Sequence, residues 1–473
     1  MSSRAGRIAA MTLLAVALAL GAGLRFYRLG AADLSADEAA AWAGASAPSI
    51  KQVVARATML DPGKLAIFDL ALHGWIALFG DSVSAMRAMS AVLGTLAIAL
   101  LFAAARAVIL VLGGRAGVER AELYAAVSAL LLAVNLTFVT QARTARMYPL
   151  VLAFEFAQVA CFVRAQASDG IVDLVGVAIF TTLAVAANFT AGLLIAAETM
   201  WLAYAGICRR VGLGGDVLCR LNLLRPAIAL FAGIAMLAPS APASGRTAID
   251  ALHAGALGWA KMRGVWWPLV MLRSASGKAP FLVLAPMALY GAWRMGRGCA
   301  AGALGFLLCW LLGPIALLMI VSHAISPLEE TRYAISSVAA FFIIAAVGLG
   351  AVENSKLRVA LIALVVALSL DHLRRDFIKP RYVEWREASV LALRTAGPGE
   401  IAVSPAYAVN VVRYYLPTAL RSSAKPAGER CDPAHRVLVL TGRGVVAPAQ
   451  ITRLEKCDPI IVGRLRLVEV RTR

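Results

Sequence analysis

The run Ile8-Ala-Ala-Met-Thr-Leu-Leu-Ala-Val-Ala-Leu-Ala-Leu-Gly-Ala-Gly-Leu24 follows Arg4 and Arg7 and contains no charged residue. A basic start followed by a short apolar core is typical of a cleaved signal peptide. Further apolar stretches, close to the ~20 residues that cross a bilayer, recur as far as about Asp371. We therefore interpret the first run as an uncleaved membrane anchor and as the first of many spans.

Composition supports a membrane setting for the whole chain. Hydrophobic residues make up 60% of the 473 residues, charged residues make up 15%, and the mean hydropathy is +0.77. A soluble globular chain is far less apolar. The net charge of +19 does not indicate a nucleic-acid partner, because many basic residues fall in predicted inner links or in the tail, where anionic lipid headgroups account for them. These values predict a polytopic α-helical membrane protein.

Charge placement orients the predicted spans. With Arg4 and Arg7 in the cytoplasm, the links on the same side are short and basic, as the positive-inside rule expects. The outer links are then 25–85, 141–148, 188–189, 243–278 and 322–334, and the two long ones predict juxtamembrane helices. We predict about eleven transmembrane helices, at 8–24, 86–112, 122–140, 149–167, 171–187, 190–208, 226–242, 279–295, 299–321, 335–353 and 357–371.

The last part of the chain is more polar than the rest. Residues 372–473 contain the β-rich runs Ile401-Ala-Val-Ser and Arg436-Val-Leu-Val-Leu-Thr, together with a predicted helix from Trp385 to Arg394. We predict two domains, a transmembrane domain at 1–371 and a small α/β soluble domain at 372–473 on the outer side.

The cysteines agree with this orientation. Cys431 and Cys457 both lie in the predicted outer tail, where an oxidising compartment would allow a disulfide between them. The other five cysteines fall in predicted spans or at their inner ends, and no Cys/His cluster indicates a zinc site.

Asp37 and Glu38 stand side by side in the first outer link, in the sequence Leu34-Ser-Ala-Asp37-Glu38-Ala. Adjacent carboxylates beside a membrane span are costly unless they do chemistry, so both are candidate catalytic residues. A purely structural role is also compatible with the pattern. Ser35 or Asp37 can cap the helix that follows, and Glu38 can stabilise its first turn.

Basic residues also recur in the outer links, although the positive-inside rule concentrates them in the inner links. Candidate contacts to an anionic ligand are Lys64, Arg143, Arg146 and Arg332. Arginine suits bidentate contact to phosphate. The alternative is ordinary anchoring, in which these side chains extend to the lipid headgroups.

The order of these motifs resembles the GT-C superfamily of membrane glycosyltransferases, in the branch of bacterial aminoarabinose transferases and protein O-mannosyltransferases. The resemblance is strongest over residues 25–150 and rests on their order along the chain. The motifs are the Arg-Leu-Gly…Leu-Ser-Ala-Asp37-Glu38-Ala loop, Leu65-Ala-Ile-Phe-Asp-Leu-Ala-Leu-His73-Gly-Trp75-Ile-Ala-Leu-Phe-Gly80-Asp81-Ser with Arg87, Gln141-Ala-Arg143-Thr-Ala-Arg146-Met147-Tyr148, Arg332-Tyr333, and the tail segment Tyr382-Val-Glu-Trp385-Arg-Glu-Ala.

The resemblance implies transfer of a sugar from a polyprenyl-phosphate donor to an extracytoplasmic lipid, glycan or protein, without nucleotide sugars. In this chain Asp37 would act as general base on the acceptor. Arg146 and Arg143, with Lys64 or Arg332, would stabilise the lipid phosphate as it leaves. No protein nucleophile is needed, so we expect a single displacement with inversion at the anomeric carbon.

Four further residues are candidate substrate contacts: Tyr148, His73, Asp61 and Tyr333. Tyr148 is also a typical interfacial aromatic, and a lone His on an apolar stretch is more often structural. Where relatives have a His-Pro-Pro-like turn, this chain reads Leu60-Asp61-Pro62-Gly63-Lys64. Asp61 or Lys64 could therefore replace family contacts to the acceptor or to the donor.

We expect no required cofactor and no metal site, although Asp37 with Glu38 could hold a divalent cation incidentally. The expected partners are the lipid-linked donor, the acceptor and membrane lipids, at a bacterial inner membrane with the active site outside. A transporter or flippase of lipid-linked sugars is the alternative, but the sequence shows neither an evident intramembrane charge relay nor interrupted half-repeats. A non-catalytic scaffold would not need opposed acidic and basic clusters at one face.

Overall fold

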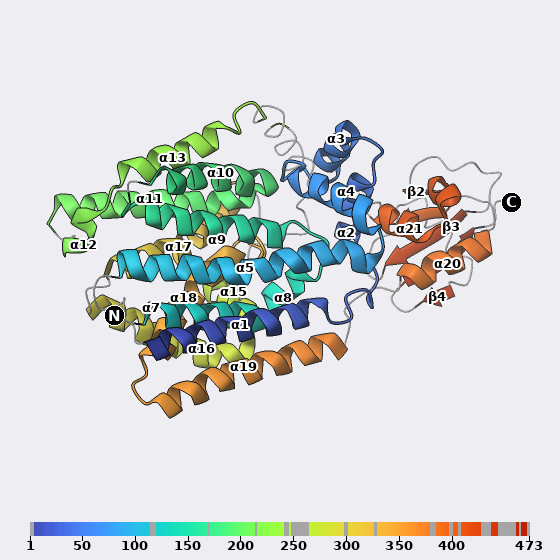
Figure 1. Ribbon diagram of the computed structural model, residues 1–473. Coiled ribbons are helices and arrows are strands. Elements are labelled where there is room, and N and C mark those ends of the chain that lie inside the picture. The colour runs from blue at the N-terminus through green and yellow to red at the C-terminus, as the bar shows by residue number, and fades with distance from the viewer. Residues whose placement is uncertain are drawn as a thin grey trace. The chain divides into compact units, whose positions relative to one another are not determined.

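A computed structural model gives the fold of the chain (Figure 1). It describes residues 4–113, 120–168, 170–212, 215–240, 246, 264–297, 301–325, 329–378, 385–396, 401–404, 408–426, 437–442, 460–462 and 465–470. Cys431 and Cys457, the predicted disulfide pair, lie outside the described residues.

The chain divides into two compact units. Unit 1 consists of Met1–Tyr27, Asp61–Phe68 and Arg87–Ile378, and unit 2 consists of Arg28–Leu60, Asp69–Met86 and Lys379–Arg473. The first predicted outer link therefore contributes to both units, and most of it belongs with the C-terminal segment. The domain boundary that the sequence places at residue 371 stays a prediction.

Helices of different lengths build unit 1, and the helix that begins at Val83 has its first four residues in unit 2. They are α1 (Arg4–Phe26), α5 (Val83–Leu112), α7 (Ala121–Val134), α8 (Leu136–Ala142), α9 (Tyr148–Ala165), α10 (Ile171–Ala187), α11 (Gly192–Arg210), α12 (Gly215–Arg220), α13 (Leu224–Ala235), α15 (Trp267–Ser276), α16 (Lys278–Arg297), α17 (Ala301–Ala324), α18 (Ile335–Ala351) and α19 (Ser355–Ile378), with the 3-10 turn η1 (Phe189–Ala191) before α11.

Five helices among the described residues are long and apolar enough to cross a membrane: α1, α5, α9, η1 with α11, and α17. The pair α7 and α8 makes a sixth if it counts as one span bent by 63°. Each of the eleven predicted spans overlaps one of the helices of unit 1. The count of eleven crossings itself stays a prediction.

The bend between α7 and α8 has a local cause at Asn135. Its backbone is extended, and its side chain accepts a hydrogen bond from the Phe138 amide at 3.2 Å, which caps α8. The Asn135 amide group also donates to the Ala275 carbonyl at 2.8 Å. A capping residue that leaves the helical conformation ends one helix and begins the next.

The helices α16 and α18 cross through glycines. A Cβ atom added at Gly348 would lie 1.9 Å from the Met287 carbonyl oxygen, and one added at Gly291 would lie 2.2 Å from the Ile344 carbonyl oxygen. Backbone oxygens cannot move away as side chains can. Small residues at such crossings allow two helices to pack closely where no hydrophobic driving force pulls them together.

We expect Gly348→Ala to destabilise unit 1 by about 3 kcal/mol, because the added methyl group forces the two backbones apart. Gly296→Ala is the matched control on α16, since its Cβ would meet a Leu304 side-chain carbon at an ordinary 3.6 Å. Thermal unfolding in detergent measures both. Equal melting temperatures for the two variants would contradict the close crossing.

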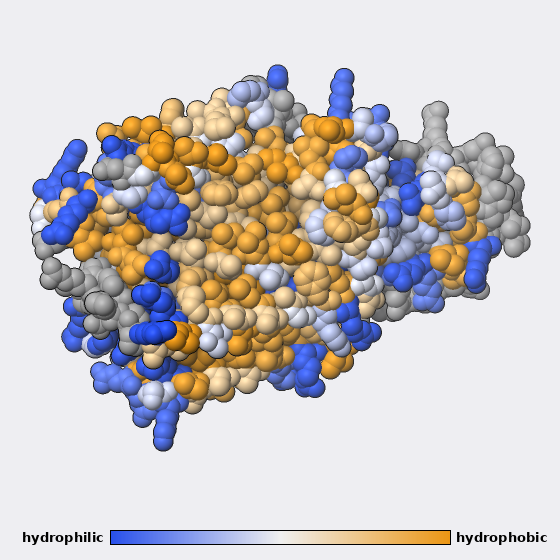
Figure 2. Space-filling model, in the orientation of Figure 1, coloured by the Kyte–Doolittle hydropathy of each residue, from blue (hydrophilic) through white to orange (hydrophobic). Residues whose placement is uncertain are grey.

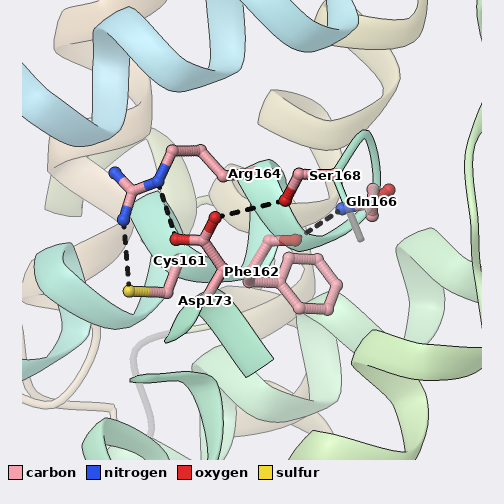
Figure 3. Close-up of polar contacts among 6 residues, drawn as sticks. All are labelled: Cys161, Phe162, Arg164, Gln166, Ser168 and Asp173. Carbon is pink, nitrogen blue, oxygen red and sulfur yellow. Dashed lines mark hydrogen bonds and ion pairs between the residues drawn. The ribbon is translucent and has the colours of Figure 1, made fainter. Parts of the chain in front are cut away.

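Polar contacts close the connection between α9 and α10 (Figure 3). The Arg164 Nε donates to Asp173 at 2.8 Å, the Ser168 hydroxyl donates to the same carboxylate at 3.3 Å, and an Arg164 Nη contacts the Cys161 sulfur at 3.4 Å. The Gln166 side chain accepts from the Trp201 indole at 3.0 Å. This connection lies on the predicted inner side, and its network ties α9, α10 and α11 together.

The surface of unit 1 is apolar around its long helices. Figure 2 shows hydrophobic residues gathered over α5 and its neighbours on the visible face, with hydrophilic side chains around α12 and the start of α19. Arg209 and Arg210 end α11 and Arg220 ends α12, at the predicted inner side. An apolar surface of this kind is what contact with the lipid chains requires.

Unit 2 combines short helices with a sheet. The helices are α2 (Ala36–Ala45), α3 (Ile50–Leu60), α4 (Ile67–Phe79, whose first two residues belong to unit 1), α20 (Trp385–Ala396), α21 (Val409–Tyr415) and the 3-10 helix η3 (Thr418–Ser423). The five strands, in the order β2-β1-β3-β5-β4, are β1 (Ile401–Ser404), β2 (Ala424–Pro426), β3 (Val437–Gly442), β4 (Ile460–Val462) and β5 (Leu465–Val470).

The sheet is mixed. β1 pairs in parallel with β2 and β3, in registers that place Ile401 opposite Ala424 and Leu438, whereas β5 pairs antiparallel with β3 and β4. Both β-rich runs of the sequence form strands, β1 and β3, and the predicted helix from Trp385 is α20. An independent α/β domain at 372–473 stays a prediction.

Candidate active site

Unit 1 brings together six of the residues that the sequence singles out. We name Asp61, Lys64, Arg146, Tyr148, Arg332 and Tyr333 the Asp61 cluster. They come from three predicted outer links that are far apart in the sequence. The Asp61 carboxylate lies 3.0 Å from an Arg146 Nη and 3.5 Å from the Lys64 Nζ. The Lys64 side chain is 1% exposed and that of Arg146 is 11% exposed, so both charges are largely removed from water.

Backbone contacts fix the segment that carries Lys64. The Gly63 carbonyl accepts a hydrogen bond from the Phe189 amide at 3.1 Å, and the Leu65 amide donates to the Ala186 carbonyl at 2.8 Å. Lys64 is therefore held from both sides against the end of α10. Its ammonium also lies 5.6 Å from the centre of the Phe68 ring. A buried ammonium held in this way offers a fixed positive charge.

Arg146 stands in the short turn between α8 and α9. The Ser90 hydroxyl of α5 donates to its carbonyl at 3.3 Å, and its amide donates to the Thr144 carbonyl at 2.8 Å. Tyr148 opens α9 two residues later and is buried, with Arg332, Arg146, Tyr333 and Asp61 acting electrostatically on its hydroxyl. The turn thus places a guanidinium and a phenol in one cluster.

Arg332 and Tyr333 precede α18. The Arg332 guanidinium lies 5.5 Å from the centre of the Tyr333 ring. Burial raises the pKa of Tyr333 above its ordinary value, although Arg332 and Arg146 act in the opposite direction. Tyr333 therefore remains a neutral phenol at physiological pH, beside three cations and one carboxylate.

Arg143, the other predicted phosphate contact, has a different environment. Its guanidinium donates to the carbonyl oxygens of Leu24 at 3.1 Å and Arg25 at 3.3 Å, and it stacks 4.5 Å from the centre of the Phe377 ring. These carbonyls belong to the last turn of α1, where a cation is favoured by the helix dipole. Such contacts favour a structural role in joining α1 to the end of α8.

The predicted catalytic pair lies in unit 2, at the start of α2. Ser35 caps this helix, because its hydroxyl accepts from the Glu38 amide at 3.3 Å while the Glu38 carboxylate accepts from the Ser35 amide at 2.9 Å. This reciprocal pair is a capping box. Glu38 is fully buried, whereas Asp37 is exposed. The two neighbours are thus in different environments, and Asp37 is the carboxylate that a substrate can reach.

The spacing Ser35-x-x-Glu38 was a sequence signal for this capping box. The capping box assigns Glu38 a structural partner, Ser35, in addition to the catalytic role that its adjacency to Asp37 predicts.

Aromatic residues hold α2 against the C-terminal segment of the same unit. The Trp42 indole donates to the Asp81 carboxylate at 3.1 Å, and the Tyr414 hydroxyl donates to the Asp81 carbonyl at 2.9 Å. The Trp42 and Tyr414 rings meet edge to face, and the Arg421 guanidinium lies 4.8 Å from the centre of the Trp42 ring. No local pattern marks Trp42, Tyr414 or Arg421, because the contacts among them join the first outer link to a segment more than three hundred residues later.

Two further contacts join the loop before α2 to the same segment. The Tyr415 hydroxyl accepts from the Leu34 amide at 2.8 Å. The Asp33 carboxylate accepts from the Arg386 amide at 2.8 Å, which places it at the start of α20. Ala39 of α2 packs in a common apolar cluster with Val411 and Val412. The helix that carries Asp37 is therefore fixed by residues from the far end of the chain.

We expect Tyr415→Phe to loosen the start of α2, because the Leu34 amide loses its partner. The cost should be about 1–2 kcal/mol, as for a part-buried donor left unsatisfied. Hydrogen exchange of the amides from Leu34 to Trp42 measures it. Unchanged protection in Tyr415→Phe would show that this contact does not hold α2.

His73 lies on α4, half-buried, with its Nδ1 at 2.7 Å from the Ala45 carbonyl oxygen. This contact ties α4 to the last residue of α2. It is a structural contact within unit 2, in line with the alternative that the sequence left open for His73.

The described residues of unit 1 include several buried carboxylates that belong to none of the sequence motifs, among them Glu155 and Glu198. Glu155 on α9 and Glu198 on α11 are both almost fully buried. The Glu198 carboxyl accepts from the Gln158 side-chain amide at 2.7 Å, and the Ser336 hydroxyl of α18 accepts from the Trp310 indole at 3.0 Å. Ionisable residues inside membrane helices are rare and often functional.

Comparisons with known proteins establish the fold. No protein-family model matches the sequence, and no curated protein sequence matches it significantly. ArnT from Cupriavidus metallidurans, bound to undecaprenyl phosphate, is structurally similar, with a TM-score of 0.60, 14% identity and 97% of both chains covered. The apo state of that protein gives a TM-score of 0.59 over the same share of both chains, also at 14% identity.

A second similar structure is the archaeal oligosaccharyltransferase AglB from Archaeoglobus fulgidus, in complex with an inhibitory peptide and a dolichol-phosphate. Its TM-score is 0.53 at 12% identity, over 90% of this chain and 65% of AglB. At these identities the likeness is one of fold. The chain is a multi-pass helical protein with the fold of ArnT and AglB, two members of the GT-C superfamily that its motifs resemble.

Proposed function

We propose that this protein is a membrane glycosyltransferase that moves a sugar from a polyprenyl-phosphate donor to an extracytoplasmic acceptor. The observation that carries the proposal is the Asp61 cluster, where Lys64, Arg146 and Arg332 gather beside two tyrosines. Three cations around one place suit a phosphate group. Of the similar structures, ArnT is bound to undecaprenyl phosphate and AglB is in complex with a dolichol-phosphate. These ligands support a lipid phosphate as the ligand of the cluster.

In the proposed reaction an acceptor hydroxyl or amine attacks the anomeric carbon and loses its proton to the Asp37 carboxylate. The bond between the anomeric carbon and the phosphate oxygen breaks, and both of its electrons remain on that oxygen. Lys64, Arg146 and Arg332 stabilise the charge that develops there. One displacement forms one new glycosidic bond, so the anomeric configuration inverts. Glu38 supports the start of α2 through its capping box.

The finer features of the proposal follow from the sequence. We place the protein in a bacterial inner membrane, with the active site on the periplasmic side, because the three segments of the Asp61 cluster all come from predicted outer links. The transferred sugar is a hexose or a pentose. The displacement needs only the side chains named above, so we propose transfer without a required cofactor.

A transporter or flippase of lipid-linked sugars is the second candidate. The observation in its favour is the buried pair Glu155 and Glu198 in the interior of unit 1, since transporters use such residues to bind protons or ions. The exposed Asp37 beside a structural Glu38 favours the transferase, because movement of a lipid-linked sugar requires no base at the outer surface.

The test reconstitutes the purified protein in vesicles that contain radiolabelled polyprenyl-phosphate sugars and a bacterial membrane extract as acceptor. The transferase predicts label in a product that no longer carries the polyprenyl chain. The flippase predicts intact labelled donor in the opposite leaflet, detected by its accessibility to an added periodate reagent. Heat-inactivated protein in the same vesicles is the control. Leaflet exchange without transfer would overturn the transferase proposal.

A further inference from the structure

Asp61 is the one acidic member of the Asp61 cluster. Its carboxylate contacts both Arg146 and Lys64, at 3.0 Å and 3.5 Å, and so occupies the place where a phosphate oxygen would be bound. The two cations are nearly inaccessible, while the Asp61 side chain is 23% exposed. Asp61 is therefore the most exposed of these three side chains.

The chain segments that carry both cations are fixed at the backbone. The neighbours of Lys64, Gly63 and Leu65, are hydrogen-bonded to Phe189 and Ala186, and the Arg146 carbonyl accepts from the Ser90 hydroxyl. A buried ammonium without a counter-ion is strongly destabilising, so Asp61 stabilises the site when no lipid is bound. A phosphate that enters must compete with this carboxylate.

The proposed reaction changes the charge of the lipid. The donor is a phosphodiester with one negative charge, whereas the lipid that leaves is a phosphomonoester with a charge of about −1.5 to −2 at pH 7. A site with three cations alone would bind the product more tightly than the donor, and tight product binding slows turnover. One fixed carboxylate beside the cations reduces this difference.

We propose that Asp61 is a built-in counter-ion that competes with the lipid phosphate for Arg146 and Lys64 and so allows the spent lipid to leave. The proposal rests on the proposed function, in which the cluster binds a polyprenyl phosphate. In this role Asp61 does not contact the sugar. It determines how strongly the protein prefers the spent lipid, a phosphomonoester, over the donor, a phosphodiester.

The experiment measures binding of undecaprenyl phosphate and of its monomethyl ester to detergent-solubilised wild type and to Asp61→Asn, at pH 8. We expect Asp61→Asn to bind undecaprenyl phosphate about 10- to 100-fold more tightly. In this variant no carboxylate competes with the phosphate for the charged hydrogen bonds of Arg146 and Lys64. Its preference for the monoester over the methyl ester should rise about tenfold. Turnover should fall, with stronger inhibition by added undecaprenyl phosphate.

Asp371→Asn is the matched control, since Asp371 pairs with Arg374 and Arg375 on α19 and has no contact with the cluster. An affinity of Asp61→Asn for undecaprenyl phosphate that is equal to or lower than that of the wild type would overturn the proposed role of Asp61 as a counter-ion. If Asp61→Asn does not fold, the affinities of the wild type for the two lipids test the proposal. A wild type that prefers the monoester over the methyl ester by more than about 100-fold would show that Asp61 does not limit product affinity. A wild type that binds neither lipid would overturn the proposed function itself.

Discussion

Asp37→Asn is expected to lower the rate of sugar transfer sharply while leaving polyprenyl-phosphate binding intact. An amide is isosteric with the carboxylate but cannot take the proton of the acceptor. General base catalysis contributes about 10²- to 10⁴-fold, so the rate should fall by that factor. The measurement is transfer of radiolabelled sugar from the polyprenyl donor at saturating acceptor, beside binding of undecaprenyl phosphate.

Glu38→Gln is the informative companion to this variant. A glutamine keeps the capping box, because its side-chain oxygen can still accept from the Ser35 amide. We therefore expect Glu38→Gln to fold and to retain transfer within a small factor. Undiminished transfer in Asp37→Asn would remove the proposed base, and a collapse of transfer in Glu38→Gln would move that role to Glu38.

Arg146→Gln is expected to weaken binding of undecaprenyl phosphate by about 10- to 100-fold, the value of a charge-assisted hydrogen bond of 1.5–3 kcal/mol. Transfer should fall further, by about 10²- to 10³-fold, since the guanidinium also stabilises charge on the leaving oxygen. The physical basis is the position of Arg146, which is 11% exposed and faces Asp61 beside Lys64.

Arg143→Gln is the matched variant three residues earlier. Its guanidinium binds carbonyl oxygens at the end of α1. Its loss should lower stability by about 1–2 kcal/mol and leave lipid binding unchanged. Thermal unfolding and lipid binding measured on both variants separate the two roles. A larger loss of lipid affinity in Arg143→Gln than in Arg146→Gln would contradict the assignment.

These two arginines illustrate how far the sequence reaches. Both stand in one motif at the mouth of a predicted span, and both are plausible phosphate contacts by residue type. The pattern places them on the outer side, but it carries no information about the partner of each guanidinium. One meets Asp61, from a loop more than eighty residues earlier, and the other meets the end of α1.

Asp37 and Glu38 show the same limit at shorter range. Their adjacency in a polar loop identifies a candidate for catalysis, and Ser35 before them indicates a helix start. Which of the two carboxylates is buried depends on which face of the helix packs against the rest of the protein. The structure buries Glu38 in the capping box and exposes Asp37. Trp42, Tyr414 and Tyr415 carried no sequence signal at all, because their contacts join the first loop to the C-terminal segment.

Helical membrane architecture and two of the C-terminal strands follow from the sequence alone, because hydrophobic periodicity and run length are local properties that need no partner. The motifs also indicated the GT-C fold. The pairing of Asp61 with Arg146 and Lys64, the backbone contacts of Arg143 and the packing of α21 on α2 are visible only in the folded chain. These are contacts between distant segments, and packing of the whole chain decides which side chains meet.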